Sequence, residues 1–162
     1  MALIEAQLAA KGLELPEPAK VPTGVVIDFA WARVHGHTVY VSGHAALAAD
    51  GTLVGPFGRV GAEVSPEQAA KAAELATVAM LASIKREIGD LDRIEAWLRV
   101  DGFVLVAPGF ERTTNVINGC SRLLVDLFGP ERGRHARTAM GVAATPLSAP
   151  VIVAAQVALK RD

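Results

Sequence analysis

One arginine is the residue of this chain best suited to bind an anion. Arg137 stands near the start of the apolar segment 136–144, where a cation is costly unless it is paired or solvated. Its guanidinium group presents a planar fork of donors that fits a carboxylate through two hydrogen bonds. The sequence leaves two interpretations open: a clamp for a carboxylate ligand, or a structural ion pair with an Asp or Glu, including one from a neighbouring subunit.

A second candidate site lies at the end of the apolar segment 38–43. Ser42 and Gly43 can offer backbone N–H and C=O groups to a ligand, because glycine permits close approach. A strand-terminal turn explains the same two residues equally well. His44 follows them, either as a ligand contact and general base near neutral pH or as an ordinary solvated histidine.

The remaining histidines and the cysteine do not predict a metal site. His35 and His37 flank a glycine at an expected hairpin turn, and neither a cysteine nor a pair of carboxylates completes a site with them or with His135. Cys120 lies in an expected helix without the spacing of a catalytic triad, so we interpret it as a packed thiol. We therefore expect no bound metal.

No nucleotide cofactor is expected either. Segment 55–61 is rich in glycine, but it lacks a strong preceding strand and a following G-K-[ST]. Asn115 and Asn118 remain open, since each can cap a helix or reach into a cleft.

Composition places the chain among compact single-domain proteins. Its 162 residues, 51% of them hydrophobic, suffice for one domain over residues 1–162 that buries about 70% of its unfolded surface. The 16 basic and 17 acidic residues are scattered and give a net charge of −1, which favours neither a nucleic acid nor a membrane as partner. The first residues lack a basic leader, so we expect a cytoplasmic protein. A mean hydropathy of +0.34 with few aromatic residues suggests surface hidden in an oligomer.

The hydrophobic pattern predicts strands and helices in the order ββ, α, β, α, ββ. Residues 1–22 comprise a short helix, over 2–11, and an arm with three prolines. Two strands follow, over 25–34 and 38–43, and Gly36 supplies the positive φ of the turn between them. Ser65, Pro66 and Gln68 form a complete helix start, and that helix should run to Ile88 and stop at Gly89.

The second half of the chain repeats the alternation of strand and helix. We expect a strand over 94–106 and a helix over 110–128, with Thr113 or Thr114 as N-cap and a well-formed part over 116–127. The strands 136–144 and 151–159 should form a final hairpin. Hairpins at both ends and two long helices on one side predict an α+β, two-layer sandwich with a mixed sheet.

Several motifs resemble the RidA family of reactive-intermediate deaminases, also called L-PSP endoribonuclease-like proteins. The resemblance covers nearly the whole chain and points to a longer subfamily with an N-terminal extension. The matching motifs are V-Y-V-S-G-H at 39–44, Arg137-Thr138, L-P-E-P at 15–18, G-F-V at 102–104, V-I-N-G at 116–119 and G-R-H-A-R at 133–137.

This resemblance implies a chorismate-mutase-like subunit that forms a homotrimer with clefts between subunits. In active members an arginine at the position of Arg137 clasps the carboxylate of a 2-imino acid. A glutamate on the last strand is proposed to activate water for hydrolysis to the 2-keto acid and ammonia. The match also assigns Ser42, Gly43, Asn118 and Thr138 to the substrate site.

Four positions depart from the family pattern, two of them being His44 in place of the usual glutamine and Ala139 in place of a cysteine. Ile152 stands where the glutamate is expected, and Phe29 stands where an early tyrosine is expected. The resemblance therefore leaves two functions: a hydrolase of small 2-imino acids, or a trimer that keeps the carboxylate pocket as a ligand-binding or partner protein. If one residue replaces the glutamate, His44 is the first candidate.

Overall fold

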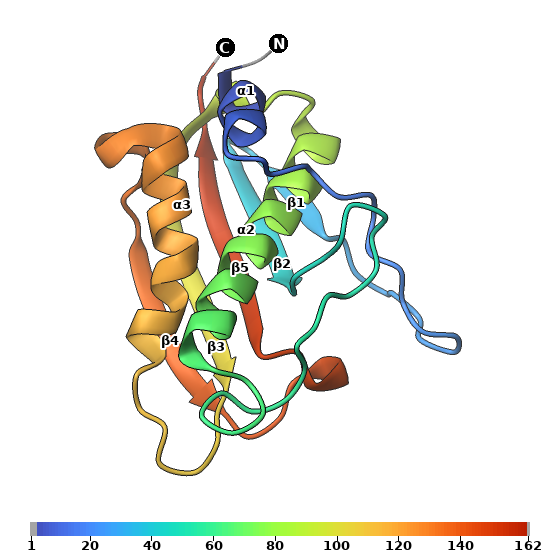
Figure 1. Cartoon of the computed structure of the whole chain (residues 1–162). Helices are drawn as coiled ribbons and strands as arrows, with labels where there is room; N and C mark the ends of the chain where they lie inside the picture. The colour runs from blue at the N-terminus through green and yellow to red at the C-terminus, as the bar shows by residue number, and fades with distance from the viewer. Residues whose placement is uncertain (1–2, 162) are drawn as a thin grey trace.

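The computed structural model describes residues 3–161 as one mixed sheet with helices packed on it (Figure 1). The elements are α1 (Leu3–Ala10), β1 (Ala32–His35), β2 (Thr38–His44), α2 (Pro66–Ile88), η1 (Leu91–Arg93), β3 (Ile94–Leu105), α3 (Thr113–Gly133), β4 (Ala136–Val142), η2 (Pro146–Ser148) and β5 (Val151–Leu159). The strand order is β1-β2-β5-β3-β4, with β3 and β4 parallel and the other neighbours antiparallel. α2 and α3 lie across one face of the sheet, so the predicted α+β two-layer architecture is confirmed.

Helix α2 forms where its sequence signals place it. The Gln68 backbone N–H donates to Ser65 Oγ at 3.1 Å, and the Ser65 N–H donates to Gln68 Oε1 at 2.9 Å, which completes the capping box. Pro66 opens the first turn, and Gly89 ends the helix after Ile88. Buried alanines along α2 bring its axis close to the sheet.

Helix α3 differs from the prediction at both ends. Arg112 occupies the N-cap position, and the Thr113 hydroxyl donates to the Ala139 carbonyl of β4 instead of capping the helix. At the other end Gly129 has a φ of 79° and interrupts the helix, yet a further turn runs on to Gly133. Pro130 can start that turn because its fixed φ suits a first helical position.

Gly119 in α3 is a contact point between the two long helices. A Cβ atom built on it would lie only 2.0 Å from the Ala70 carbonyl oxygen of α2. Helix propensity alone disfavours glycine in a helix interior. Here the missing side chain lets the backbones of α2 and α3 meet.

The first predicted strand is too long. β1 begins at Ala32, and residues 25–31 form a loop outside the sheet. Val25 and Val26 are exposed, while the ring of Phe29 packs edge-on against that of Trp31 at a centroid distance of 4.9 Å. The apolar residues of this segment thus line a surface pocket rather than alternate across a sheet. The predicted turn between β1 and β2 is confirmed, with Gly36 at a φ of 60°.

The expected C-terminal hairpin is wrong, because β4 and β5 do not pair with each other. β3 lies between them, parallel to β4 and antiparallel to β5. The connection through η2 passes the end of β3 (Figure 1). β3 carries buried residues through most of its length and gains hydrogen-bonding partners on both edges from this arrangement.

The N-terminal helix closes one end of the core. Ile4 and Leu8 of α1 are buried, whereas Ala2, where the sequence predicts the helix to begin, lies outside the described residues. The sheet face opposite α2 and α3 carries exposed Tyr40 and Met140. None of the helices within residues 3–161 is long and apolar enough to cross a membrane.

Candidate functional site

Strand β4 directs Arg137 toward α3. Arg137 pairs in register with buried Val100, so both lie on the helix-covered side of the sheet. Its Nη1 donates to Asn118 Oδ1 at 2.8 Å and to Ser121 Oγ at 3.0 Å, and its Nη2 donates to the Thr114 carbonyl at 3.3 Å. No Asp or Glu between residues 3 and 161 forms an ion pair with this guanidinium group. Neutral acceptors therefore position a half-buried cation whose charge is left unpaired by the described chain.

His135 extends the hydrogen-bond network of Arg137. Its Nε2 lies 2.8 Å from Ser121 Oγ, and its Nδ1 lies 2.7 Å from the Gly133 carbonyl oxygen. Burial lowers the pKa of His135, and the charge of Arg137 lowers it further, while the bond to Gly133 acts in the opposite direction. The imidazole is therefore mainly neutral at pH 7.

From the sequence, His135 is a metal-ligand candidate and a member of the motif 133–137, but neither it nor Ser121 is predicted to be a site residue. A signal for both was present. Thr114, Asn118 and Ser121 are spaced by four and three residues, so they form one polar stripe on α3. His135 and Arg137 are two residues apart in an extended segment and point to the same side. What the sequence did not reveal is that the stripe and the strand face each other.

His44 is buried and both of its ring nitrogens are hydrogen-bonded, so of the two interpretations left open by the sequence, that of an ordinary solvated histidine is wrong. Its Nδ1 lies 2.5 Å from the Ser42 carbonyl oxygen, and its Nε2 lies 2.8 Å from Ser83 Oγ of α2. Burial lowers its pKa to about 4, with a smaller contribution in the same direction from the charge of Arg86. The ring is neutral at pH 7 and has no free nitrogen for a substrate proton. Ser42 itself donates its hydroxyl to the Ala30 carbonyl at 2.7 Å.

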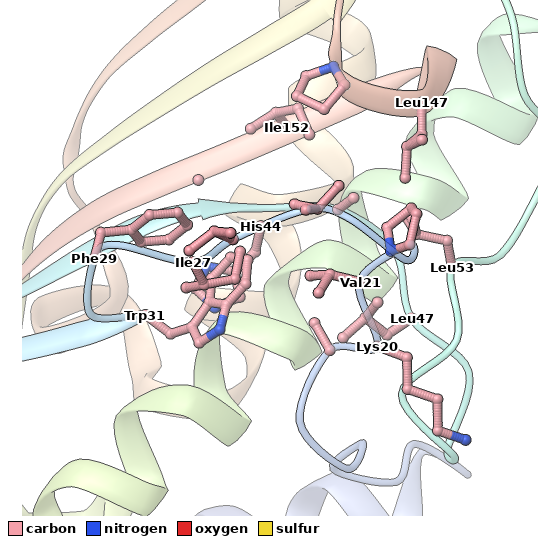
Figure 2. A pocket seen from close by; sticks show the side chains of 17 residues that line it. Lys20, Val21, Ile27, Phe29, Trp31, His44, Leu47, Leu53, Leu147 and Ile152 are labelled. Carbon is pink, nitrogen blue, oxygen red and sulfur yellow. The ribbon is translucent and has the colours of Figure 1, made fainter.

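Four of the predicted site residues line one apolar pocket of about 440 Å³, which we call the arm pocket (Figure 2). Phe29 comes from the loop before β1, Gly43 and His44 from the end of β2, and Ile152 from β5. The other residues around the pocket are mainly apolar: Ala19, Lys20, Val21, Pro22, Val25, Val26, Ile27, Trp31, Ala45, Leu47, Leu53, Pro146 and Leu147. The Lys20 side chain extends out of the pocket toward Asp50, at 3.5 Å. This lining favours binding of an apolar ligand group over a charged one.

Ile152 forms one wall of the arm pocket, and Gly43 makes room for it. A Cβ atom on Gly43 would lie 2.8 Å from Ile152 Cγ2. Beside this wall Leu147 and Ser148 adopt φ values of 56° and 55°, in the left-handed region that residues with side chains rarely occupy. Such strained backbone is concentrated at ligand-binding segments of proteins.

The remaining predicted residue, Thr138, lies on the other side of the sheet from Arg137. Its hydroxyl accepts a hydrogen bond from Arg99 Nη2 at 2.7 Å, and Arg99 pairs with Asp101 at 3.0 Å. β4 also stands at one edge of the sheet, separated from β2 by β3 and β5. One chain therefore brings Arg137 and Asn118 together, and separately Phe29, Gly43, His44 and Ile152, but it does not join these two groups.

Cys120 is packed inside α3, as the sequence suggested. Burial raises the pKa of its thiol to about 11, so the reactive thiolate is scarce at pH 7. Asn118 serves as an acceptor for Arg137 and not as a helix cap. His35 and His37 are exposed at the β1–β2 turn, whereas His135 contacts α3 next to β4 at the other sheet edge.

Comparison with known proteins agrees with this architecture. Residues 5–158 match the family model described as "YjgF/chorismate_mutase-like, putative endoribonuclease". Protein TCP17 of Trypanosoma cruzi is 33% identical over 156 residues, which cover 96% of this chain and 94% of that protein. The Agrobacterium tumefaciens protein Atu1372, of unknown function, has the same fold with a TM-score of 0.85 at 34% identity, covering 97% of this chain and 92% of that one. A "putative endoribonuclease" of Shewanella oneidensis matches with a TM-score of 0.87 at 29% identity, covering 96% and 99% of the two chains.

These similarities and the fold define a chorismate-mutase-like α+β protein. The chain belongs to the YjgF family, which is the RidA family that its sequence motifs resemble.

Proposed function

We propose that this protein hydrolyses small 2-imino acids to 2-keto acids and ammonia, with Arg137 binding the substrate carboxylate. The observation that carries the proposal is the environment of the guanidinium group: three neutral acceptors fix its position, and no acidic side chain of the described residues pairs with it. A positioned and uncompensated arginine is suited to bidentate binding of a carboxylate. Family membership supports the same role.

The active unit we propose is a homotrimer. Arg137 lies near one edge of the sheet, and the arm pocket lies toward the other, so an assembly in which the β4 edge of one copy meets the arm pocket of the next joins the two regions. Such a head-to-tail contact closes into a ring when the rotation per copy fits. Exposed Tyr40 and Met140 on the sheet face without α2 and α3 offer apolar surface for such an assembly.

In this arrangement the two regions have separate tasks. Arg137 fixes the carboxylate, and the apolar arm pocket holds the side chain of the imino acid and excludes water from it. Water attacks the imine carbon. Because imines of this kind hydrolyse readily, positioning and electrostatic stabilisation contribute a large share of the acceleration.

A second candidate function is a trimer that binds a small carboxylate without turning it over. Ile152 favours this alternative, since an apolar side chain replaces the expected glutamate. His44 also favours the binding protein, because both of its ring nitrogens are hydrogen-bonded within the chain and its pKa is lowered to about 4.

The test is hydrolysis of 2-iminobutanoate generated in place by an amino-acid oxidase, with semicarbazide competing for the imine. Wild type, Arg137→Ala and a reaction without protein are compared, and Arg122→Ala serves as a matched control because Arg122 is an exposed arginine of α3. We expect hydrolysis above background in wild type and Arg122→Ala and none in Arg137→Ala. Equal rates with and without protein would contradict the hydrolase, and binding of 2-ketobutanoate by wild type but not Arg137→Ala would then identify the binding protein.

A further inference from the structure

We propose that Ser121 and His135 are the proton-transfer pair of the Arg137 site and supply the acid–base function that Ile152 cannot. The inference rests on the proposed imine hydrolysis. It assigns a role to two residues: His135 lies within the matched motif 133–137, but the match gives a function neither to it nor to Ser121.

The hydrogen bonds of this pair fix the direction in which a proton moves. The Gly133 carbonyl can only accept, so the proton of a neutral His135 ring sits on Nδ1, 2.7 Å from that oxygen. Nε2 then carries the lone pair and accepts from the Ser121 hydroxyl at 2.8 Å. Arg137 Nη1 donates to the same Ser121 oxygen at 3.0 Å. The hydroxyl therefore has a base on one side and a cation on the other.

This geometry is that of an activated hydroxyl. A base within hydrogen-bond reach withdraws the proton, a third group orients the base, and a fixed positive charge stabilises the oxygen as negative charge develops on it. The lowered pKa of His135 keeps Nε2 unprotonated at neutral pH.

The pair is also within reach of a ligand held by Arg137. Ser121, His135 and Arg137 are all half-buried near the β4 edge, in contrast to His44, which is 4% exposed. The three hydrogen bonds of Arg137 use three of its five N–H groups and leave two for a carboxylate. These two groups belong to Nε and Nη2, whereas Ser121 contacts Nη1 of the same guanidinium group, so the inference requires the imine carbon of the bound substrate to extend along this group to the Ser121 hydroxyl.

The proposed reaction balances as follows. Water adds to the imine carbon and passes a proton to Ser121 Oγ, whose own proton moves to His135 Nε2, while the C=N π electrons move to nitrogen. His135 then returns its proton through Ser121 to the nitrogen of the carbinolamine. The hydroxyl proton of the carbinolamine then moves to this nitrogen as the C–N bond breaks, so the nitrogen leaves as ammonia and the oxygen becomes the keto oxygen. One imino acid and one water give one 2-keto acid and one ammonia.

The experiment compares His135→Gln, Ser121→Ala and Ser121→Thr with wild type. Glutamine can still accept from Ser121 but does not take up the proton, and threonine keeps the hydroxyl. We expect kcat to fall about 100-fold in His135→Gln and Ser121→Ala, with KM nearly unchanged and activity largely retained in Ser121→Thr. His37→Gln, at the exposed β1–β2 turn, is the matched control and should behave as wild type.

Two further readouts separate proton transfer from support of Arg137. In wild type, kcat/KM should fall as the pH drops through the pKa of His135, and this step should vanish in His135→Gln. Binding of 2-ketobutanoate, measured by calorimetry, should persist in His135→Gln and Ser121→Ala and disappear in Arg137→Ala. If His135→Gln and Ser121→Ala lost binding of 2-ketobutanoate while their kcat/KM kept the pH dependence of wild type, His135 and Ser121 would only position Arg137. That result would overturn the proposal.

The outcomes also separate this inference from the proposed function. Wild-type kcat in His135→Gln, with hydrolysis still dependent on Arg137, would overturn the proton-transfer pair and leave the hydrolase intact. An inactive wild type would contradict both. Circular dichroism shows whether each variant folds. If His135→Gln does not fold, Ser121→Ala still tests the proposal.

Discussion

Arg137 and Ile152 project from opposite faces of the same sheet. Val100 of β3 pairs with Arg137 on one side and with Ala155 on the other, so these three side chains share the helix-covered face. Ile152 precedes Ala155 by three residues and therefore points to the other face. A carboxylate at position 152 can approach Arg137 only from a second copy of the chain.

This relationship predicts a site shared between copies, and the assembly proposed for it is a trimer. We expect the copies to meet at the sheet face with Met140. Met140 is 55% exposed in the single chain, and Met140→Glu would bury a charge in the assembly. We expect light scattering coupled to size exclusion to give three times the chain mass for wild type and a smaller species for Met140→Glu, with imine hydrolysis lost.

Leu3→Glu is the control for that substitution. Leu3 is similarly large and apolar and is 58% exposed, but it lies on α1 and not on the sheet. It should leave the trimer intact. A wild type that elutes as a monomer and still hydrolyses the imine would contradict the shared site.

The same relationship predicts that a glutamate at position 152 can replace the proposed proton-transfer pair. In the His135→Gln background, Ile152→Glu should raise kcat at least about tenfold, because a carboxylate on a neighbouring copy would face the substrate. Ile152→Gln in that background has similar size and polarity without basicity and should give no gain. Equal rates for the two double variants would contradict a site shared between copies.

The signals in the sequence were sufficient wherever the structure depends on nearby residues. Helix α2 begins after Ser65, at Pro66, and ends before Gly89, as predicted, because helix caps and prolines act on residues close to them in the sequence. The pairing of β4 with β3 was missed, since two apolar segments joined by a short loop fit a hairpin equally well. Whether β4 pairs with β5 or with β3 depends on contacts between strands that are distant in the sequence.

The candidate site divides in the same way. Arg137 could be found from its chemistry, because a cation in an apolar segment requires a partner. The burial of His44 could not, since it depends on Ser83 of α2, which is 39 residues away in the sequence. Likewise the contact between Ser121 and His135 depends on how α3 lies over β4.

Gly119 provides a test of the helix contact. Gly119→Ala would add a Cβ atom at 2.0 Å from the Ala70 carbonyl oxygen, which is backbone and can move only with its helix. Although alanine favours helix, we expect the free energy of unfolding to fall by about 1–3 kcal/mol because the site is overpacked. Denaturant unfolding measures this change.

Asn115→Ala, at an exposed position of the same helix, is the matched control. It should leave the stability within about 0.5 kcal/mol of wild type or raise it slightly. A stabilised Gly119→Ala protein would show that α2 and α3 do not depend on this close contact.

His44 predicts how the stability of the fold changes with pH. Its pKa of about 4 in the folded state lies below the ordinary value of 6.5, so between these values the unfolded chain binds more protons than the folded one. The free energy of unfolding must therefore fall as the pH drops. His44 alone should lower it by about 2 kcal/mol between pH 7 and pH 5. His135, whose pKa is also lowered, contributes in the same direction.

Denaturant unfolding at pH 7 and pH 5 measures this loss, and His44→Gln and His37→Gln separate its sources. Glutamine at position 44 can hydrogen-bond to Ser42 and Ser83 without titrating, so that variant should lose most of the difference in stability between the two pH values. His37 is exposed at the β1–β2 turn, and its substitution should leave the difference unchanged. If His44→Gln retained the full loss of stability at pH 5, the buried imidazole would not be its source.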